Sequence, residues 1–394
     1  MIGIRENIKD LDKIKIKHLT FVGGRVERVI QFYIDIFNLL KSIDRFPRTL
    51  NTTINKAITD SRKKHKLLDY KQLIKVLLKP NRKYENLGQL YKVKYSDNRI
   101  DAAKNNISRT VSKLQSLLIV YRKILALDFE DDAPHTIQFY SNLQLEYGQI
   151  NFLLENIFDY DNWFSKLDLN DDWGPYQLTS ALNQNTCPFC NRQYTFTIMT
   201  IDGAKVARPQ LDHFLPKSLN PLLGLSFFNL IPSCGVCNSS IKSSKPTSFN
   251  THLNPYEKNE FNGLMRFSYT PLTYEGSIGL TSEVDVEIRY DGLPTDKLLE
   301  KKIQGNIEMF CLNDVYKNHT DAVQEIIRKR HISNDKYIES IQTMYNHLNL
   351  SLEETYRLAY GNYYNEKEHF KRPLAKLTRD IAVELGAIFP FPKK

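Results

Sequence analysis

The sequence predicts an α+β protein that is mostly helical, with one loop-rich segment and one β-hairpin. Apolar residues recur at three- and four-residue spacing in 25–43 and 105–127, the period of a helix with one buried face. This period is lost between Cys187 and about Tyr256, where short strands, turns and loops are expected. Residues 264–290 alternate and carry β-branched and aromatic side chains, which favours a hairpin.

The remaining elements are mostly helices. Residues 70–95 predict a basic helix, a turn at Pro80-Asn81 and a Tyr/Lys-rich stretch, and residues 137–166 predict one more helix. Gly174-Pro175 is typical of a boundary. After the hairpin, helices are expected over 297–312, 318–330, 333–348 and 351–386, the last broken near Pro373.

Three domains follow from this pattern. We expect a helical N-terminal domain at 1–175, a cysteine-bearing core at 176–260, and a C-terminal region at 261–394 whose hairpin and helices pack on the core. The chain of 394 residues is long enough for two or three domains.

Charge is distributed unevenly along the chain. Residues 1–123 hold 28 Lys and Arg against 11 Asp and Glu, whereas residues 124–186 hold 1 against 11. The basic block predicts contact with nucleic acid or an acidic partner surface, and the acidic block either masks a site or binds a partner. Solvated helix faces would produce the same charge pattern, so both interpretations stay open.

Several classes of protein are disfavoured. No apolar run approaches the roughly 20 residues that span a bilayer, and the N-terminus lacks the apolar core of a secretory signal. We therefore expect a cytoplasmic protein with no membrane partner. No G-x-x-x-x-G-K loop is present, so any use of ATP would depend on another chain.

Four of the five cysteines form two Cys-x-x-C pairs, Cys187 with Cys190 and Cys234 with Cys237. In a reducing compartment such pairs bind metal more often than they form disulfides. Four thiolates suit a closed tetrahedral zinc site that is structural rather than catalytic, the alternative being buried thiols without metal. Cys311 lies in an apolar helical context and is expected in the core.

The segment between the two pairs contains "QLDHFLPKS" at 210–218, and "FFNLIPSCGVCNSS" follows at 227–240. Asp212 and His213 are followed sixteen residues later by Asn229, and Asn238 comes directly after the second pair. This order resembles the HNH endonucleases of the ββα-metal (His-Me finger) superfamily, in the subclass with two Cys-x-x-C pairs. The resemblance covers Cys187 to about Lys245 and implies a zinc-stabilised ββα-metal (HNH) finger.

The resemblance also implies a mechanism. His213 would act as the general base on a water that attacks a phosphodiester, because imidazole titrates near neutral pH. Asp212 and Asn238 would hold one catalytic Mg²⁺ or Mn²⁺ at the leaving oxygen, since hard cations prefer oxygen ligands. Asn229 would tie its loop to the histidine strand and orient the imidazole. Asp212 and His213 would point to opposite faces of a strand.

Each of these assignments has a plainer alternative. Asp212-His213 could be a surface turn, and Asn238 could cap the helix that follows it. Four basic residues flank the core and are candidate phosphate contacts or solvated side chains: Arg192, Lys217, Lys242 and Lys245. His252 is either a site residue or a packing histidine.

Beyond the finger, "HLNPYE", "FCLNDVYKNH" and "RPLAKLTRDIAVELG" resemble the tail of bacterial antiphage (Septu-like) HNH nuclease subunits, which work beside an ATPase subunit. We therefore expect a metal-dependent endonuclease that hydrolyses DNA, with double-stranded DNA favoured by the resemblance alone and RNA left open. An ATPase or sensor protein is the expected partner. The alternative is a zinc-stabilised module that binds nucleic acid or protein without cleaving it.

Overall fold

The computed structural model describes the following residues: 1–42, 50–67, 73, 97–129, 133–167, 171–202, 204–257, 263–292, 296–332, 337–344 and 346–386. These residues form two compact units, each built from segments distant in sequence. One unit comprises Asp12–Leu178 and Leu215–Leu230, and the other comprises Met1–Leu11, Thr179–Phe214 and Ile231–Lys394. The division into three domains expected from the sequence stays a prediction.

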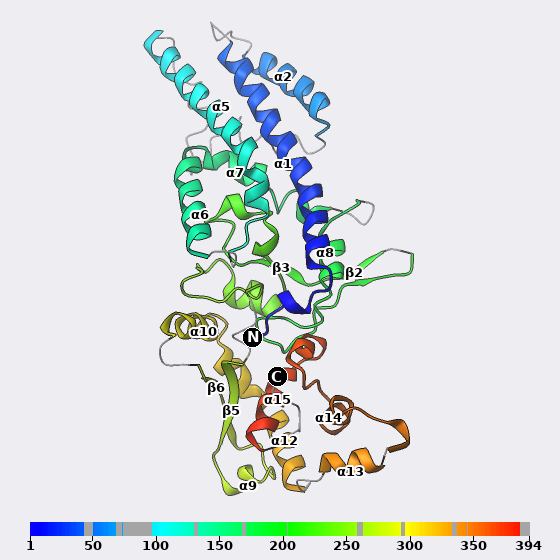
Figure 1. The fold of residues 1–394 in the computed structure, drawn as a ribbon. Coiled ribbons are helices and arrows are strands. Elements are labelled where there is room, and N and C mark those ends of the chain that lie inside the picture. The colour runs from blue at the N-terminus through cyan, green and yellow to red at the C-terminus, as the bar shows by residue number, and fades with distance from the viewer. Residues whose placement is uncertain are drawn as a thin grey trace. The chain divides into compact units, whose positions relative to one another are not determined.

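The unit that begins at Asp12 is helical. Its main elements are α1 (Leu11–Lys41), α2 (Leu50–His65), α5 (Asp97–Leu125), α6 (Ala133–Tyr147) and α7 (Asn151–Ile157), with short 3₁₀ turns η2 (Gly148–Ile150), η3 (Phe164–Lys166), η4 (Pro221–Leu223) and η5 (Phe227–Asn229). Figure 1 shows α1, α2 and α5 as long rods. The short helix α8 (Pro175–Leu182) follows Gly174.

The core of this helical unit follows the apolar period of its two longest helices. On α5, Ile107, Leu114 and Tyr121 are buried at seven-residue spacing, so one face of the helix is covered along its length. On α1, Val26 and Tyr33 show the same spacing. The helices expected over 25–43 and 105–127 are therefore confirmed where the structure describes them.

The single helix expected over 137–166 is wrong. Helix α6 ends at Tyr147, a 3₁₀ turn begins at Gly148, and α7 ends at Ile157. Glycine weakens a helix because fixing its backbone costs the most conformational entropy. The basic stretch at 70–95 lies outside the described residues, apart from Leu73.

A buried histidine joins distant parts of the same unit. His18 is fully buried; its Nε2 donates to the carbonyl oxygen of Leu225 at 2.9 Å, and its Nδ1 accepts from the indole of Trp173 at 3.2 Å. These two bonds require the neutral ring protonated on Nε2. Burial lowers the pKa of His18 from 6.5 to about 4.

We expect this histidine to make the protein sensitive to acid. Because the pKa is lower in the folded state, the stabilisation is fully present above pH 6.5 and is lost as the pH falls towards 4. Between pH 7 and 4.5 the loss from His18 is about 2.5 kcal/mol of unfolding free energy. Urea unfolding of wild type and His18→Gln at both pH values measures it. An equal pH dependence in the two proteins would contradict the prediction.

In the second unit, the described residues form three two-stranded sheets. They pair β1 (Ile198–Met199) with β2 (Lys205–Ala207), β3 (Gln210–His213) with β4 (Leu230–Ser233), and β5 (Met265–Pro271) with β6 (Val284–Tyr290). The β5–β6 pair is antiparallel, with Met265 opposite Tyr290 and Pro271 opposite Val284. Phe267 and Val286 are buried on one face, so the hairpin expected within 264–290 is confirmed.

Helices complete this unit. They are the 3₁₀ turn η1 (Arg5–Asn7), the π-helix η6 (Val236–Lys242), α9 (Tyr274–Ser277), α10 (Lys297–Met309), α11 (Leu312–Tyr316), η8 (Lys317–His319), α12 (Thr320–Ile332), α13 (Tyr337–Met344), η9 (Asn346–Leu348), α14 (Leu352–Tyr360), η10 (Glu366–Lys371) and α15 (Ala375–Glu384). Helix α12 packs against α15 and β6, and α15 packs against β5 (Figure 1).

Two expectations for this region need correction. The stretch 351–386 is broken before Pro373 as well as near it, because α14 already ends at Tyr360, capped by Gly361 with φ of 70°, the 3₁₀ turn η10 follows, and α15 begins only after Pro373. Cys311 is exposed rather than in the core. It stands between α10 and α11 in the left-handed region, with φ of 48°, so the helical period that suggested burial is interrupted there.

A buried ion pair fixes α15 to the hairpin. Asp380 Oδ2 lies 3.1 Å from Lys376 Nζ and accepts the amide of Phe267 at 3.1 Å, and both charged side chains are almost inaccessible. Burial alone would raise the pKa of Asp380, but the positive charges of Lys376 and Arg379 hold it below its usual value.

We expect Asp380→Ala to lower the unfolding free energy by about 3–5 kcal/mol, because it leaves the ammonium of Lys376 buried without its counter-ion. Denaturant unfolding measures the loss. Asp314→Ala is the matched control, since Asp314 and Lys317 form an exposed ion pair on a helix and should contribute less than about 0.5 kcal/mol. Equal losses in the two variants would contradict the prediction.

Candidate functional site

The four cysteines of the two Cys-x-x-C pairs come together. The Sγ atoms of Cys187, Cys190, Cys234 and Cys237 all lie within 4.8 Å of one another, and all four residues are buried. A tetrahedral zinc with bonds of about 2.3 Å places its sulfur ligands about 3.8 Å apart. The cluster therefore fits a structural metal such as zinc, as expected from the sequence.

Buried thiolates need a cation. Burial raises the pKa of the Cys187 thiol, so its ionised form is unfavourable without a positive charge beside it. A structural metal such as zinc would supply that charge and would join the two chain segments that carry the cysteines. All four thiols are free of disulfides.

The first cysteine pair is anchored to the C-terminal helices by Asn191. Its backbone is left-handed, with φ of 48°, and its amide donates to the carbonyl oxygen of Cys187 at 2.7 Å. Its side chain donates to the carbonyl oxygen of His369 at 3.0 Å and accepts the amide of Lys376 at 3.1 Å. The hydroxyl of Tyr316 donates to the carbonyl oxygen of Cys190. The segment that carries the first cysteine pair is therefore part of the same core as α15.

The segment between the cysteine pairs supplies a strand, a second strand and a helix. Strand β3 ends with Asp212 and His213 and pairs with β4, after which the second cysteine pair leads into η6. Helix η6 also packs on β3. Because β4 and η6 lie on either side of Cys234, a metal bound there fixes the start of the helix relative to the strands.

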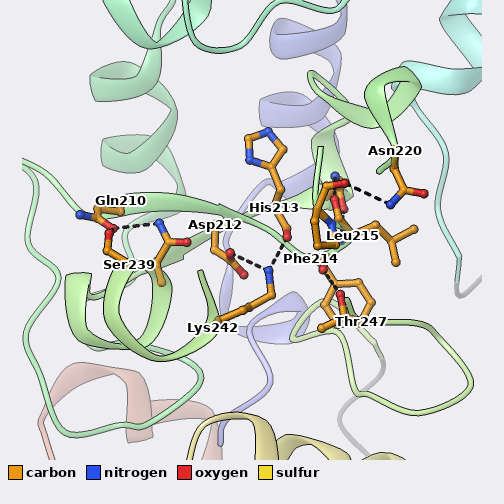
Figure 2. Close-up of polar contacts among 12 residues, drawn as sticks. Gln210, Asp212, His213, Phe214, Leu215, Asn220, Ser239, Lys242 and Thr247 are labelled. Carbon is orange, nitrogen blue, oxygen red and sulfur yellow. Dashed lines mark hydrogen bonds and ion pairs between the residues drawn. The ribbon is translucent and has the colours of Figure 1, made fainter. Parts of the chain in front are cut away.

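Asp212 forms an ion pair that the sequence analysis did not anticipate. The ammonium of Lys242, at the end of η6, donates to Asp212 Oδ1 at 2.8 Å and to the carbonyl oxygen of His213 at 2.6 Å (Figure 2). Lys242 is 1% exposed and Asp212 is 2% exposed. One buried cation therefore holds η6 against both residues of the Asp-His pair.

His213 projects its imidazole to the side of β3 opposite the carboxylate of Asp212 (Figure 2). This is the alternation expected for neighbours in a strand. The histidine is 7% exposed. Its backbone carbonyl faces Lys242, so the strand around the imidazole is held by a charge-assisted hydrogen bond.

Asn238 lies within η6, where its side chain donates to Gln210 Oε1 at 2.8 Å. Ser239 donates to the same oxygen at 2.7 Å. Gly235 is the residue that caps η6, without a side-chain bond, so Asn238 does not act as the cap. Gln210 was missed by the sequence analysis, although its position two residues before Asp212 places it on the same face of β3.

Asn229 holds the chain that follows the Asp-His pair. Its Oδ1 accepts the amide of Leu215 at 2.8 Å, and its Nδ2 donates to the carbonyl oxygens of Leu215 and Leu223, both at 3.1 Å. Asn229 is 3% exposed. It therefore braces the backbone at Leu215, and its expected effect on the orientation of the imidazole stays a prediction.

The flanking basic residues lie in different environments. Arg192 Nη1 donates to His319 Nε2 at 3.1 Å, and Lys217 forms an ion pair with Asp161 at 3.2 Å. Lys245 is exposed. Lys242 differs from the surface phosphate contact expected of it, because its ammonium is buried against Asp212. Among these four residues, Lys245 is the most accessible to a phosphate.

His252 has the contacts of a packing residue. Its Nδ1 lies 2.8 Å from Thr251 Oγ1 and accepts weakly from the amide of Ser248 at 3.5 Å. Burial, and then the positive charge of Lys242, lower the pKa of His252. The ring is therefore close enough to the Asp212–Lys242 pair to respond to its charge.

The arrangement around Asp212 does not fit the divalent cation that the resemblance implies. Mg²⁺ is bound through carboxylate oxygens in near-octahedral geometry. Here Oδ1 of the expected carboxylate ligand, Asp212, accepts from the ammonium of Lys242 at 2.8 Å, so a buried positive charge already lies where the cation would bind. In the part of the chain that the structure describes, the cysteine cluster is the group of His, Cys, Asp and Glu residues placed to hold a metal.

Comparisons with known proteins leave the resemblance as a prediction. Searches of family models, curated proteins and solved structures found no match to this chain. Among the described residues, no helix has both the length and the apolarity needed to cross a membrane.

Proposed function

We propose that this protein is an endonuclease that hydrolyses phosphodiester bonds, with His213 as the general base. The observation that carries the proposal is the convergence of β3, β4 and η6 beside the four-cysteine cluster, with the Asp-His pair at the end of β3. A strand pair followed by a helix is the arrangement that a ββα finger requires. A non-catalytic zinc module has no need of a histidine held in this way.

In the proposed reaction His213 accepts a proton from the attacking water. Imidazole suits this role because its usual pKa lies near neutral pH. Lys242 and Asn229 both hold the backbone on the C-terminal side of the imidazole, since one bonds the carbonyl of His213 and the other the amide of Leu215. Zinc, when bound by the four cysteines, supplies structural rigidity and no reacting group.

DNA is the proposed substrate, and the basic block at 1–123 is its proposed electrostatic contact. An ATPase or sensor partner, a role in antiphage defence and a cytoplasmic location belong to the same proposal, and all rest on the sequence resemblance. The proposal also includes control of the cleavage activity by a partner or a signal, because a nuclease that cut any DNA would damage the cell that makes it.

A second candidate is a zinc-stabilised module that binds nucleic acid or protein without cleaving it. The observation that favours it is the ion pair of Asp212 with Lys242, which gives the expected metal-binding carboxylate a structural partner. The two candidates differ in one respect that can be measured, since only the nuclease needs His213 for its activity.

The test is a cleavage assay with zinc-loaded protein. Supercoiled plasmid, duplex DNA, single-stranded DNA and RNA are each incubated with the protein, without added metal and with Mg²⁺ or Mn²⁺. Cleavage of DNA by wild type supports the proposal, and preference for RNA would correct the substrate. Binding without cleavage of any substrate, with affinity unchanged in His213→Ala, would favour the second candidate.

A further inference from the structure

The positive charge that contacts Asp212 in the folded protein is the ammonium of Lys242. We propose that its ammonium takes the place of a divalent metal on this carboxylate, so that the folded protein binds no Mg²⁺ or Mn²⁺ through Asp212. The inference concerns the same residues as the proposed nuclease function. It rests on that function only for the claim that these residues form an active site. Any divalent cation that supports cleavage would then arrive with the nucleic acid or bind elsewhere.

The geometry of the ammonium supports this assignment. Lys242 Nζ makes two hydrogen bonds, to Asp212 Oδ1 at 2.8 Å and to the carbonyl oxygen of His213 at 2.6 Å. Bonds from a charged donor are short, and the bond to the carbonyl oxygen is the shorter of the two. The second bond means that movement of Lys242 away from Asp212 would also release the backbone of the histidine strand.

Burial makes the exchange of cations unfavourable. Lys242 and Asp212 are 1% and 2% exposed, so neither charge has water to replace its partner. A metal bound at Asp212 would either lie beside a like charge or require the ammonium to be expelled from the core. A surface lysine would exchange readily, because solvent compensates both charges there.

The neighbouring polar groups also hold the helix against the strand. The amide of Asn238 donates to Gln210 Oε1 at 2.8 Å, and Ser239 donates to the same oxygen at 2.7 Å. Figure 2 shows Gln210 and Asp212 contacting η6 through separate polar groups along β3. Strand β3 and helix η6 are therefore joined by hydrogen bonds within the chain at both Gln210 and Asp212.

The test measures Mn²⁺ binding rather than cleavage. Protein with one zinc per chain is titrated with Mn²⁺, and free Mn²⁺ is followed by its electron paramagnetic resonance signal. Wild type and Asp212→Asn should bind equal amounts. Lys242→Met should gain one Mn²⁺ per chain, because Asp212 then lacks its counter-ion, and the double variant Asp212→Asn/Lys242→Met should lose that site again.

The opposite pattern would overturn the inference: Mn²⁺ bound by wild type and lost in Asp212→Asn would make the aspartate a metal ligand despite Lys242. Lys242→Met removes the positive charge beside a buried carboxylate, so zinc content and circular dichroism must show that the variant is folded. If it is not, the comparison of wild type with the isosteric Asp212→Asn decides. The titration measures binding and not cleavage. Its outcome can therefore be distinguished from a failure of the proposed nuclease function.

Discussion

Cys234→Ser should abolish zinc binding and unfold the segment from Cys187 to Lys245. The four Sγ atoms lie within 4.8 Å of one another, and a metal bound by them would join chain segments more than forty residues apart, so each ligand would help to close a long loop. Structural zinc contributes an apparent binding free energy of about 10–16 kcal/mol in zinc-finger peptides. The loss of this binding free energy would exceed the total unfolding free energy of most domains.

The measurement combines metal analysis with limited proteolysis. Wild type should contain one zinc per chain and resist cleavage between Cys187 and Lys245, and a chelator should reproduce the behaviour of the variant. Cys311→Ser is the matched control, because Cys311 is an exposed cysteine outside the cluster. A Cys234→Ser protein that keeps its protease resistance and its melting temperature would show that the cluster needs no metal.

His213→Ala should reduce DNA cleavage by about 10²–10⁴-fold, the usual contribution of a general base. Zinc content and DNA affinity should stay unchanged, because the zinc ligands are elsewhere and the hydrogen bond from Lys242 is made to the backbone of His213 rather than to its ring. The effect should therefore fall on the turnover rate under saturating DNA.

The control for His213→Ala is His331→Ala, which removes an exposed histidine on α12 that contacts the carbonyl oxygen of Ser277. Its cleavage rate should match that of wild type. If His213→Ala cut DNA at the wild-type rate, the imidazole would have no part in the reaction and the general-base assignment would be withdrawn. If both histidine variants lost activity together with zinc, the loss would reflect unfolding.

Local spacing determined much of what the sequence predicted correctly. The period of α1 and α5 and the alternation of β5 and β6 each follow from backbone geometry within a few residues. The zinc ligands were also recognisable, because a Cys-x-x-C pair places two thiolates on one turn whatever surrounds it. Helix breaks at Gly148 and Gly361 were harder to place, since glycine is tolerated in many helices.

The sequence alone thus determined the helical character of the chain, the hairpin and the four cysteines that could hold a metal. Only the tertiary structure decided that Lys242 pairs with Asp212 rather than facing solvent, and that Asn191 binds the start of α15 from 185 residues away. A lysine thirty residues from an aspartate carries no local signal of its partner. The choice depends on packing, because a buried ammonium is stable only where the fold supplies a carboxylate and a carbonyl oxygen together.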